Sequence, residues 1–303
     1  RELVKEPTIR RVEEAMRSLG CQMENTVTVS KETQPLIVLN IPGIENAFYQ
    51  EIIRGARVSA KAHGCHLLIH ESHLNKGNML DFCNLLRRVD AAGIILLNRV
   101  SEEALNQIRT IAPLVQCCEY NEHADYPYVS IDDTRAAELA TEYLLANGGS
   151  KIALINGPGN FKYARRRQEG FMNALQKAEV MIPKQWIVQL PEVSYEMAYA
   201  AVCRLLNSDS RPNAFFTISD VFAAAVIRAA KRFHFHVPKD ILVVGFDNIE
   251  LSSMTTPSIT TVNQPKFQMG YTACEMLLEL MEDPHGEMKS LLLDTELVIR
   301  EST

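Results

Sequence analysis

The 303-residue chain lacks long hydrophobic runs, and no window approaches the ~18 consecutive apolar residues that a membrane-spanning helix needs. Its hydrophobic fraction of 47% is still that of an ordinary folded protein, which excludes wholesale disorder. Basic side chains are the scarcer charged class, 31 against 37 acidic ones, so the net charge is −6. This balance argues against a nucleic-acid-binding surface over the whole molecule, but it allows one small basic module.

The cysteines lack any pairing pattern. There are seven of them, an odd number, and no two have the C-x-x-C spacing of redox motifs and zinc sites. Several lie in apolar runs, where a thiol behaves as a small hydrophobic group. The first residues do not have the pattern of a signal peptide. Together these features predict a protein of the reducing cytoplasm.

The motifs of common enzyme classes are also missing. The chain contains no Walker A loop and no G-x-S-x-G nucleophile turn. The turn at 156–160 follows a predicted strand, but it is not G-x-G-x-x-G and Pro158 has no amide proton to donate. Histidines gather between 63 and 73, yet His66 and His70 would lie about 13 Å apart on a strand, too far to share a metal. We therefore expect no catalytic residues, no metal and no cofactor.

From residue 36 onward, short runs rich in Ile, Val and Leu alternate with helical stretches, as in parallel sheets that are buried on both faces. Strands are predicted at 36–41, 66–70, 93–97, 114–118, 151–155, 213–218 and 241–246, with late strands at 291–293 and 297–299. Helices are predicted at 48–63, 134–147, 163–177, 221–233 and 267–281. Two consecutive β-α-β series predict an α/β fold with two doubly wound parallel-sheet lobes.

Ligands of such folds bind beyond the carboxyl ends of the strands. Arg167, early in a predicted helix, and Asp247, after a predicted strand, could clamp a neutral polyol by donating to and accepting from its hydroxyls. A solvated helix face and a turn residue are the alternative interpretations. Ser219 and Asp220 open a helix, and capping is their favoured role.

Aromatic residues also gather near the predicted strand ends, which makes a ligand that stacks on rings plausible, although most aromatic residues belong to cores. They are Phe48, Tyr49, Phe161, Tyr163 and Phe216.

Three segments carry a family resemblance: residues 243–249 (Val-Val-Gly-Phe-Asp-Asn-Ile), 256–265 and 297–303. With support from shorter motifs in both halves, the chain resembles the lactose-repressor (LacI/GalR-type) family of bacterial transcription regulators from about residue 4 to its end. Within that family it is most similar to the cytidine- and purine-repressor branch. The resemblance implies a type I periplasmic-binding-protein fold of two lobes, with the chain passing from one lobe to the other three times. It also implies a homodimer and an effector between the lobes.

Carried onto this sequence, the resemblance also implies domain limits and effector contacts. The limits are a DNA-binding remnant at 1–20, a linker at 21–35, an N-terminal lobe at 36–131 plus 262–290, and a C-terminal lobe at 132–261 plus 291–303. The implied effector contacts are Phe48, Tyr49, Asp132, Phe161, Tyr163, Arg167, Phe216 and Asp247.

Residues 1–20 resemble the last helix of the family's helix-turn-helix domain, whose recognition helix would precede residue 1. The linker at 21–35 lacks the leucine-bearing hinge helix that such proteins press into the minor groove. The leading hypothesis is a regulator that binds operator DNA and responds to a nucleoside, nucleobase or sugar. The alternative is a secreted solute-binding protein of a transporter, which would need a signal peptide and no DNA-binding remnant.

Overall fold

The computed structural model describes residue 8 and residues 34–284, 286 and 290–303. Residues 35–303 form one compact unit, separate from residues 1–34. Apart from Thr8, the predicted DNA-binding remnant lies outside the described residues, as does nearly all of the predicted linker. Within the described part of the chain, no helix combines the length and the apolar character needed to cross a membrane.

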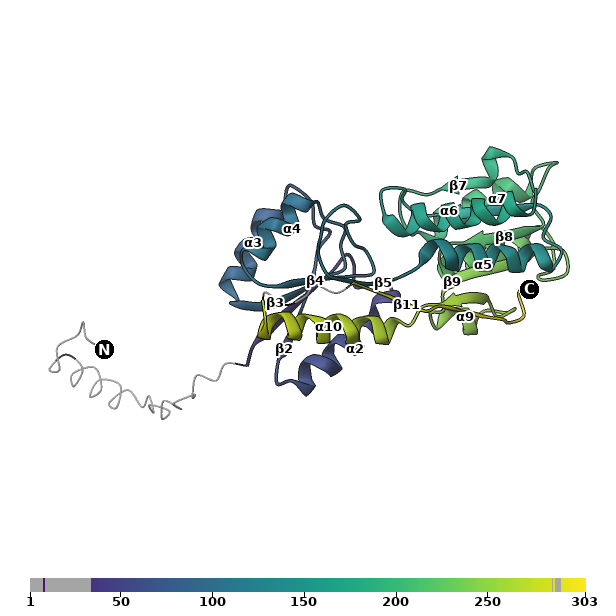
Figure 1. The fold of residues 1–303 in the computed structure, drawn as a ribbon. Helices are drawn as coiled ribbons and strands as arrows, with labels where there is room; N and C mark the ends of the chain where they lie inside the picture. The colour runs from purple at the N-terminus through teal and green to yellow at the C-terminus, as the bar shows by residue number, and fades with distance from the viewer. Residues whose placement is uncertain (1–7, 9–33, 285, 287–289) are drawn as a thin grey trace. The chain divides into compact units, whose positions relative to one another are not determined.

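The predicted α/β fold with two parallel-sheet lobes is confirmed (Figure 1). The first lobe contains a six-stranded sheet of order β11-β5-β4-β3-β1-β2, in which every pairing is parallel. Its elements are β1 (Leu36–Ile41), α2 (Phe48–Ala62), β2 (His66–Glu71), α3 (Met79–Arg88), β3 (Ala91–Leu96), α4 (Glu102–Arg109), β4 (Leu114–Cys117), β5 (Tyr128–Ile131), α10 (Lys266–Glu282) and β11 (Ser290–Leu293).

The second lobe contains a six-stranded sheet of order β12-β10-β9-β8-β6-β7, in which only the β10–β12 pairing is antiparallel. Its elements are α5 (Asp133–Ala146), β6 (Ile152–Asn156), α6 (Lys162–Lys177), a 3₁₀ turn (Lys184–Trp186), β7 (Ile187–Gln189), α7 (Tyr195–Leu206), β8 (Ala214–Thr217), α8 (Asp220–Arg232), β9 (Leu242–Asp247), α9 (Leu251–Met254), β10 (Thr260–Asn263) and β12 (Glu296–Val298).

The chain passes between the lobes three times: after β5, after β10 and after β11. The first crossing follows Ile131, the second follows Asn263 and the third follows Leu293, because β10 pairs with β9 of the second sheet and β11 pairs with β5 of the first. The domain limits expected from the sequence stay predictions. Hydrogen bonding in the sheets places residues 262–263 in the second lobe and 291–293 in the first.

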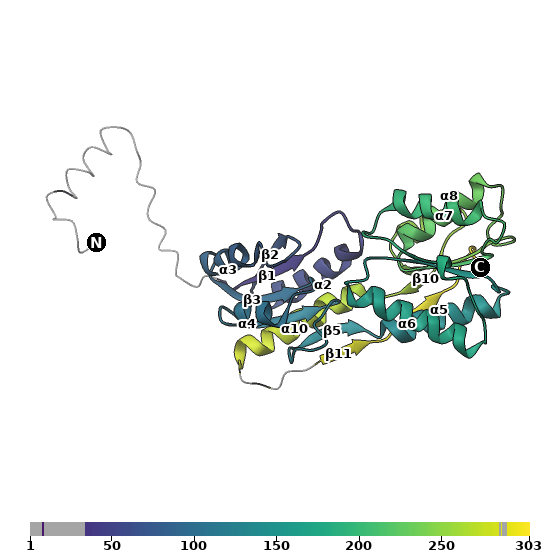
Figure 2. The same ribbon diagram turned by 90° about the horizontal axis from the view of Figure 1, so that it is seen from above.

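Each sheet is buried between two layers of helices (Figure 2). In β1 the alternation of a strand sends Ile37 and Leu39 into the larger core cluster and Val38 into a cluster with α3 and α4 on the opposite face. In the second lobe, α5 and α6 cover one face while α7 and α8 cover the other.

The crossing of α5 and α6 is closer than an ordinary helix pair allows. A Cβ atom on Gly170 of α6 would lie 2.0 Å from the carbonyl oxygen of Thr134 in α5, so only glycine fits there. The tight crossing places the start of α5, with Asp133, beside the first half of α6, with Lys162 and Arg167.

Candidate effector-binding site

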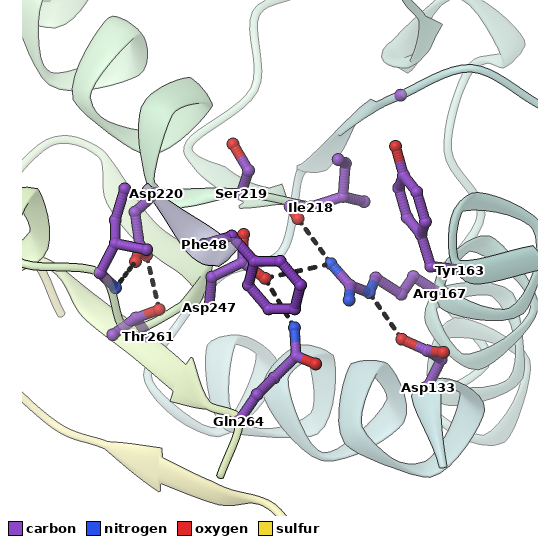
Figure 3. Close-up of polar contacts among 12 residues, drawn as sticks. Phe48, Asp133, Tyr163, Arg167, Ile218, Ser219, Asp220, Asp247, Thr261 and Gln264 are labelled. Carbon is purple, nitrogen blue, oxygen red and sulfur yellow. Dashed lines mark hydrogen bonds and ion pairs between the residues drawn. The ribbon is translucent and has the colours of Figure 1, made fainter. Parts of the chain in front are cut away.

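Arg167, in the first half of α6, is the centre of a buried ionic network. It is a long charged side chain, yet only 5% of it is exposed. Its Nε donates to Asp133 Oδ1 at 2.9 Å and its Nη1 donates to the Ile218 carbonyl oxygen at 2.7 Å. The same Nη1 lies 3.6 Å from Asp247 Oδ1, so the guanidinium lies between two carboxylates (Figure 3). The Phe246 ring packs against it, with 3.6 Å from the guanidinium carbon to the ring centroid.

Asp133, the first residue of α5, neutralises a second buried cation as well. Lys162 Nζ donates to Asp133 Oδ2 at 2.8 Å and to Ser130 Oγ at 3.0 Å, and it lies 4.6 Å from the centre of the Tyr120 ring. Burial by itself would raise the pKa of Asp133, but Lys162 and Arg167 outweigh it and hold that pKa below its usual value. Asp133 is therefore an ionised carboxylate with both oxygens occupied by the protein.

Asp247 differs from Asp133 because one of its oxygens remains available. It ends β9 with a left-handed φ of 101°, and its Oδ1 accepts from Gln264 Nε2 at 2.7 Å. Lys266 Nζ donates to its main-chain carbonyl oxygen rather than to the carboxylate. Burial raises the pKa of Asp247, while Arg167 opposes the increase. Within the described part of the chain, no group is hydrogen-bonded to Asp247 Oδ2 or to Arg167 Nη2.

Two pairs of aromatic rings accompany these polar groups, one from each lobe. Phe48 and Tyr49 open α2 of the first lobe with centroids 5.4 Å apart, and Phe48 is drawn with the ionic network in Figure 3. Phe161 and Tyr163 flank the start of α6 in the second lobe, with centroids 5.5 Å apart. Burial raises the pKa of Tyr49, and the neighbouring Tyr163 adds to the increase, so residues of both lobes converge here.

Two residues of the predicted site have structural roles in the described chain. Phe216 is fully buried and packs between Phe171 and Phe246, with centroids 6.2 and 6.4 Å away. Asp132 caps α5, because its Oδ1 accepts from the main-chain nitrogen of Arg135 at 2.9 Å. The remaining predicted residues lie at the facing ends of the lobes. They are Phe48, Tyr49, Phe161, Tyr163, Arg167 and Asp247.

The sequence analysis did not identify Asp133, Lys162 or Gln264 as members of the site. For Asp133 a usable indication existed, since an acidic pair at 132–133 directly precedes a predicted helix. For Lys162 none did, because a lysine three residues before a run of three arginines is typical of a solvated helix face.

Ser219 and Asp220, at the start of α8, have different structural roles. Ser219 caps α8 by accepting from the main-chain nitrogen of Phe222, as predicted. Asp220 is fully buried, and its carboxylate accepts from Thr261 Oγ1 at 2.5 Å and from the main-chain nitrogen of Ile249 at 2.8 Å. Burial, aided by the nearby Asp247, raises the pKa of Asp220 to about 8.

This pKa predicts a pH-dependent stability. A carboxyl group whose pKa is raised on folding holds its proton more tightly in the folded state, so stability falls as the pH rises toward the folded-state pKa. Between pH 6 and pH 8, we expect the free energy of unfolding of the wild type to fall by about 2 kcal/mol more than that of Asp220→Asn, which removes the titration. Urea unfolding at both pH values measures the difference, and parallel pH profiles for the two proteins would contradict it.

Comparisons with known proteins agree with this geometry. The model of the periplasmic binding protein-like domain matches residues 141–303, more than half of the chain. The HTH-type transcriptional repressor CytR of Escherichia coli is 33% identical over 304 residues, which cover 99% of this chain and 89% of that protein. The chain belongs to the LacI family of transcriptional regulators. The family predicted from the sequence motifs is thus confirmed, and the CytR match agrees with the predicted branch.

Other LacI-family members extend the comparison. The ribose operon repressor of E. coli is 30% identical, with 99% of this chain and 92% of that protein covered. A putative LacI regulator from Bacillus cereus has a structure that matches 89% of this chain and 99% of its own, with 27% identity and a TM-score of 0.82. A LacI-family regulator from Enterococcus faecium, solved with bound ribose, matches 88% of this chain and 98% of its own, with 26% identity and a TM-score of 0.75.

These relatives are transcriptional regulators rather than enzymes, and they favour the regulator hypothesis over a secreted solute-binding protein. Residues 35–303 correspond to the effector-binding core of this LacI-family regulator.

Proposed function

We propose that this LacI-family regulator responds to a hydroxyl-rich metabolite, either a free sugar or a nucleoside, bound where the lobes meet. The observation that carries the proposal is the arrangement of Arg167 and Asp247. Three protein contacts fix the guanidinium, yet Nη2 is left over as a donor, and Asp247 Oδ2 is left over as an acceptor. A fixed donor beside a fixed acceptor suits neighbouring hydroxyl groups, which both accept and donate.

The aromatic pairs favour a ligand with a flat or apolar face. Phe48 and Tyr49 from the first lobe and Phe161 and Tyr163 from the second offer rings against which a nucleobase or a sugar ring can pack. Phe216 and Asp132 are not included in this proposal, because the protein itself occupies their side chains.

The wider regulatory function follows from the family. We infer that the chain acts as a homodimer on operator DNA in the cytoplasm. Effector binding would change the equilibrium between lobe arrangements only by its differential affinity for them. That change would alter the spacing of the DNA-binding heads, which must match half-sites about 34 Å apart.

A thermal-shift screen of the purified chain against sugars, nucleosides and nucleobases tests the proposal. A ligand present at 100 times its dissociation constant stabilises the folded state by about 2.7 kcal/mol. We expect at least one sugar or nucleoside to raise the melting temperature of the wild type. We expect Asp247→Asn to lose most of that increase.

Asparagine is a suitable replacement because it tolerates the left-handed φ of Asp247 and can still accept from Gln264. Equal ligand-induced increases in the two proteins would remove Asp247 from the site.

A further inference from the structure

Cys117 and Cys118 bring two thiols into contact beside the proposed site. Successive side chains of a strand normally point to opposite faces, but here Sγ of Cys117 lies 3.7 Å from Sγ of Cys118. The cause is a change of backbone direction just after β4. Cys118 has a φ of 68°, and the nitrogen of Glu119 donates to the carbonyl oxygen of Cys117 at 2.9 Å. These features form a γ-turn centred on Cys118, a rare and strained conformation.

The surrounding strands hold this strained turn in place. The nitrogen of Cys118 donates to the Val129 carbonyl oxygen at 2.9 Å, and its carbonyl oxygen accepts from Ser130 Oγ at 2.8 Å. A non-glycine residue in the left-handed region persists only when its surroundings impose it, and such residues concentrate at functional sites. Ser130 also contacts Lys162, so the turn is linked to the ionic network of the second lobe.

The residue after the turn links the two lobes. The Glu119 carboxylate accepts from the main-chain nitrogens of Lys162 at 3.0 Å and Tyr163 at 2.9 Å, which lie in the first turn of α6. Glu119 belongs to the first lobe, and α6 carries Arg167. A change in the Cys117–Cys118 turn would therefore move the carboxylate that holds α6 against the first lobe.

We propose that Cys117 and Cys118 form a reversible redox site that adjusts effector binding through Glu119. One thiol, as its thiolate, attacks a peroxide oxygen and releases water or an alcohol, leaving a sulfenic acid. The second thiol then displaces that hydroxyl as water and closes the disulfide. Overall, two thiols lose two electrons and two protons, and one peroxide is reduced to two molecules of water or to water and an alcohol.

Such a disulfide would be easy to reduce again. Adjacent Cα atoms joined by a trans peptide are about 3.8 Å apart, below the range of about 4.4–6.8 Å that unstrained disulfides span. Strained disulfides have more oxidising potentials, and these are typical of labile, regulatory bonds.

The order of events follows from exposure. Cys117 is fully buried, whereas Cys118 is partly exposed, so we expect Cys118 to react first. Burial raises the pKa of the Cys118 thiol, and Cys117 adds to the increase, so the reactive thiolate forms mainly when the lobes separate and water reaches the thiol. An effector that holds the lobes together should therefore protect the pair from oxidation.

Peroxide treatment of the purified chain, followed by peptide mass spectrometry, tests the site itself. We expect the peptide containing Cys117 and Cys118 to lose two hydrogens and to recover them with dithiothreitol. Cys118→Ser should form no such product, whereas Cys203→Ser, which removes a partly exposed thiol of α7, should form it normally. A peptide that keeps both thiols, or that forms only sulfinic acid, would overturn the proposal.

Calorimetric titration with the ligand found by the screen tests the regulatory effect, which rests on the proposed function. We expect oxidation to weaken binding by roughly tenfold in the wild type and in Cys203→Ser, as loss of one or two hydrogen bonds at the lobe contact would do. In Cys118→Ser the same treatment should leave the affinity at its starting value. Disulfide formation without any change in affinity would refute the regulatory effect, whereas absence of any ligand would refute only the proposed function.

Discussion

Asp133→Ala should lower the free energy of unfolding by about 3–5 kcal/mol, because it leaves two buried cations without their shared carboxylate. Lys162 and Arg167 reach Asp133 at 2.8 and 2.9 Å, and all three side chains are nearly inaccessible to water. Removing one member of a buried ionic group costs more than the group contributes in total, since the remaining charges stay desolvated. Equilibrium unfolding in urea measures the loss.

Asp132→Ala is the matched control for this prediction. It removes the neighbouring carboxylate, which caps α5 at the surface, and should cost only about 0.5–2 kcal/mol. Losses of equal size in the two variants would show that Asp133 acts merely as part of the helix start.

Arg167→Ala should weaken effector binding by about 1–3 kcal/mol, or roughly 5- to 150-fold in the dissociation constant. The guanidinium is positioned by Asp133, by the Ile218 carbonyl oxygen and by the Phe246 ring, so a ligand hydroxyl meets a donor that is already ordered. Pre-organisation of this kind avoids the entropy cost of fixing a long side chain on binding. Isothermal titration calorimetry with the best ligand measures the change.

Arg166→Ala offers a control one residue away on the same helix. Its guanidinium is about half exposed and pairs with Glu122 and Glu169. Exposed ion pairs contribute little, so we expect its dissociation constant to stay within about twofold of the wild type. If Arg166→Ala and Arg167→Ala weakened binding equally, the effect would come from the charge of α6 rather than from a contact.

The long buried strands were predictable from the sequence because parallel strands buried on both faces form continuous apolar runs. The prediction at 36–41 matches β1, and that at 241–246 lies one residue before β9. The short strands β5 and β7 were not predicted. Ser130 interrupts the apolar run of the four-residue β5, and β7 has only three residues, so neither stands out as a continuous apolar run.

The candidate site was predictable only where a residue's position relative to a strand or helix end decided its role. Arg167 and Asp247 follow from this rule, and the structure brings them within 3.6 Å of each other. Phe216 also lies at the end of its strand, yet its side chain points into the core, because the alternation of a four-residue strand could not be assigned from sequence. The Glu119 contact with α6 depends on how the two lobes meet, which local sequence patterns do not encode.

A crystal structure of the chain with the sugar or nucleoside found by the thermal-shift screen would test the account most directly. We predict electron density for one ligand per chain, with hydroxyl groups within hydrogen-bond distance of Arg167 Nη2 and Asp247 Oδ2 and with its ring against the aromatic pairs at the lobe ends. Density for that ligand at any other place, with Arg167 and Asp247 still paired only to the protein, would contradict the proposed effector site.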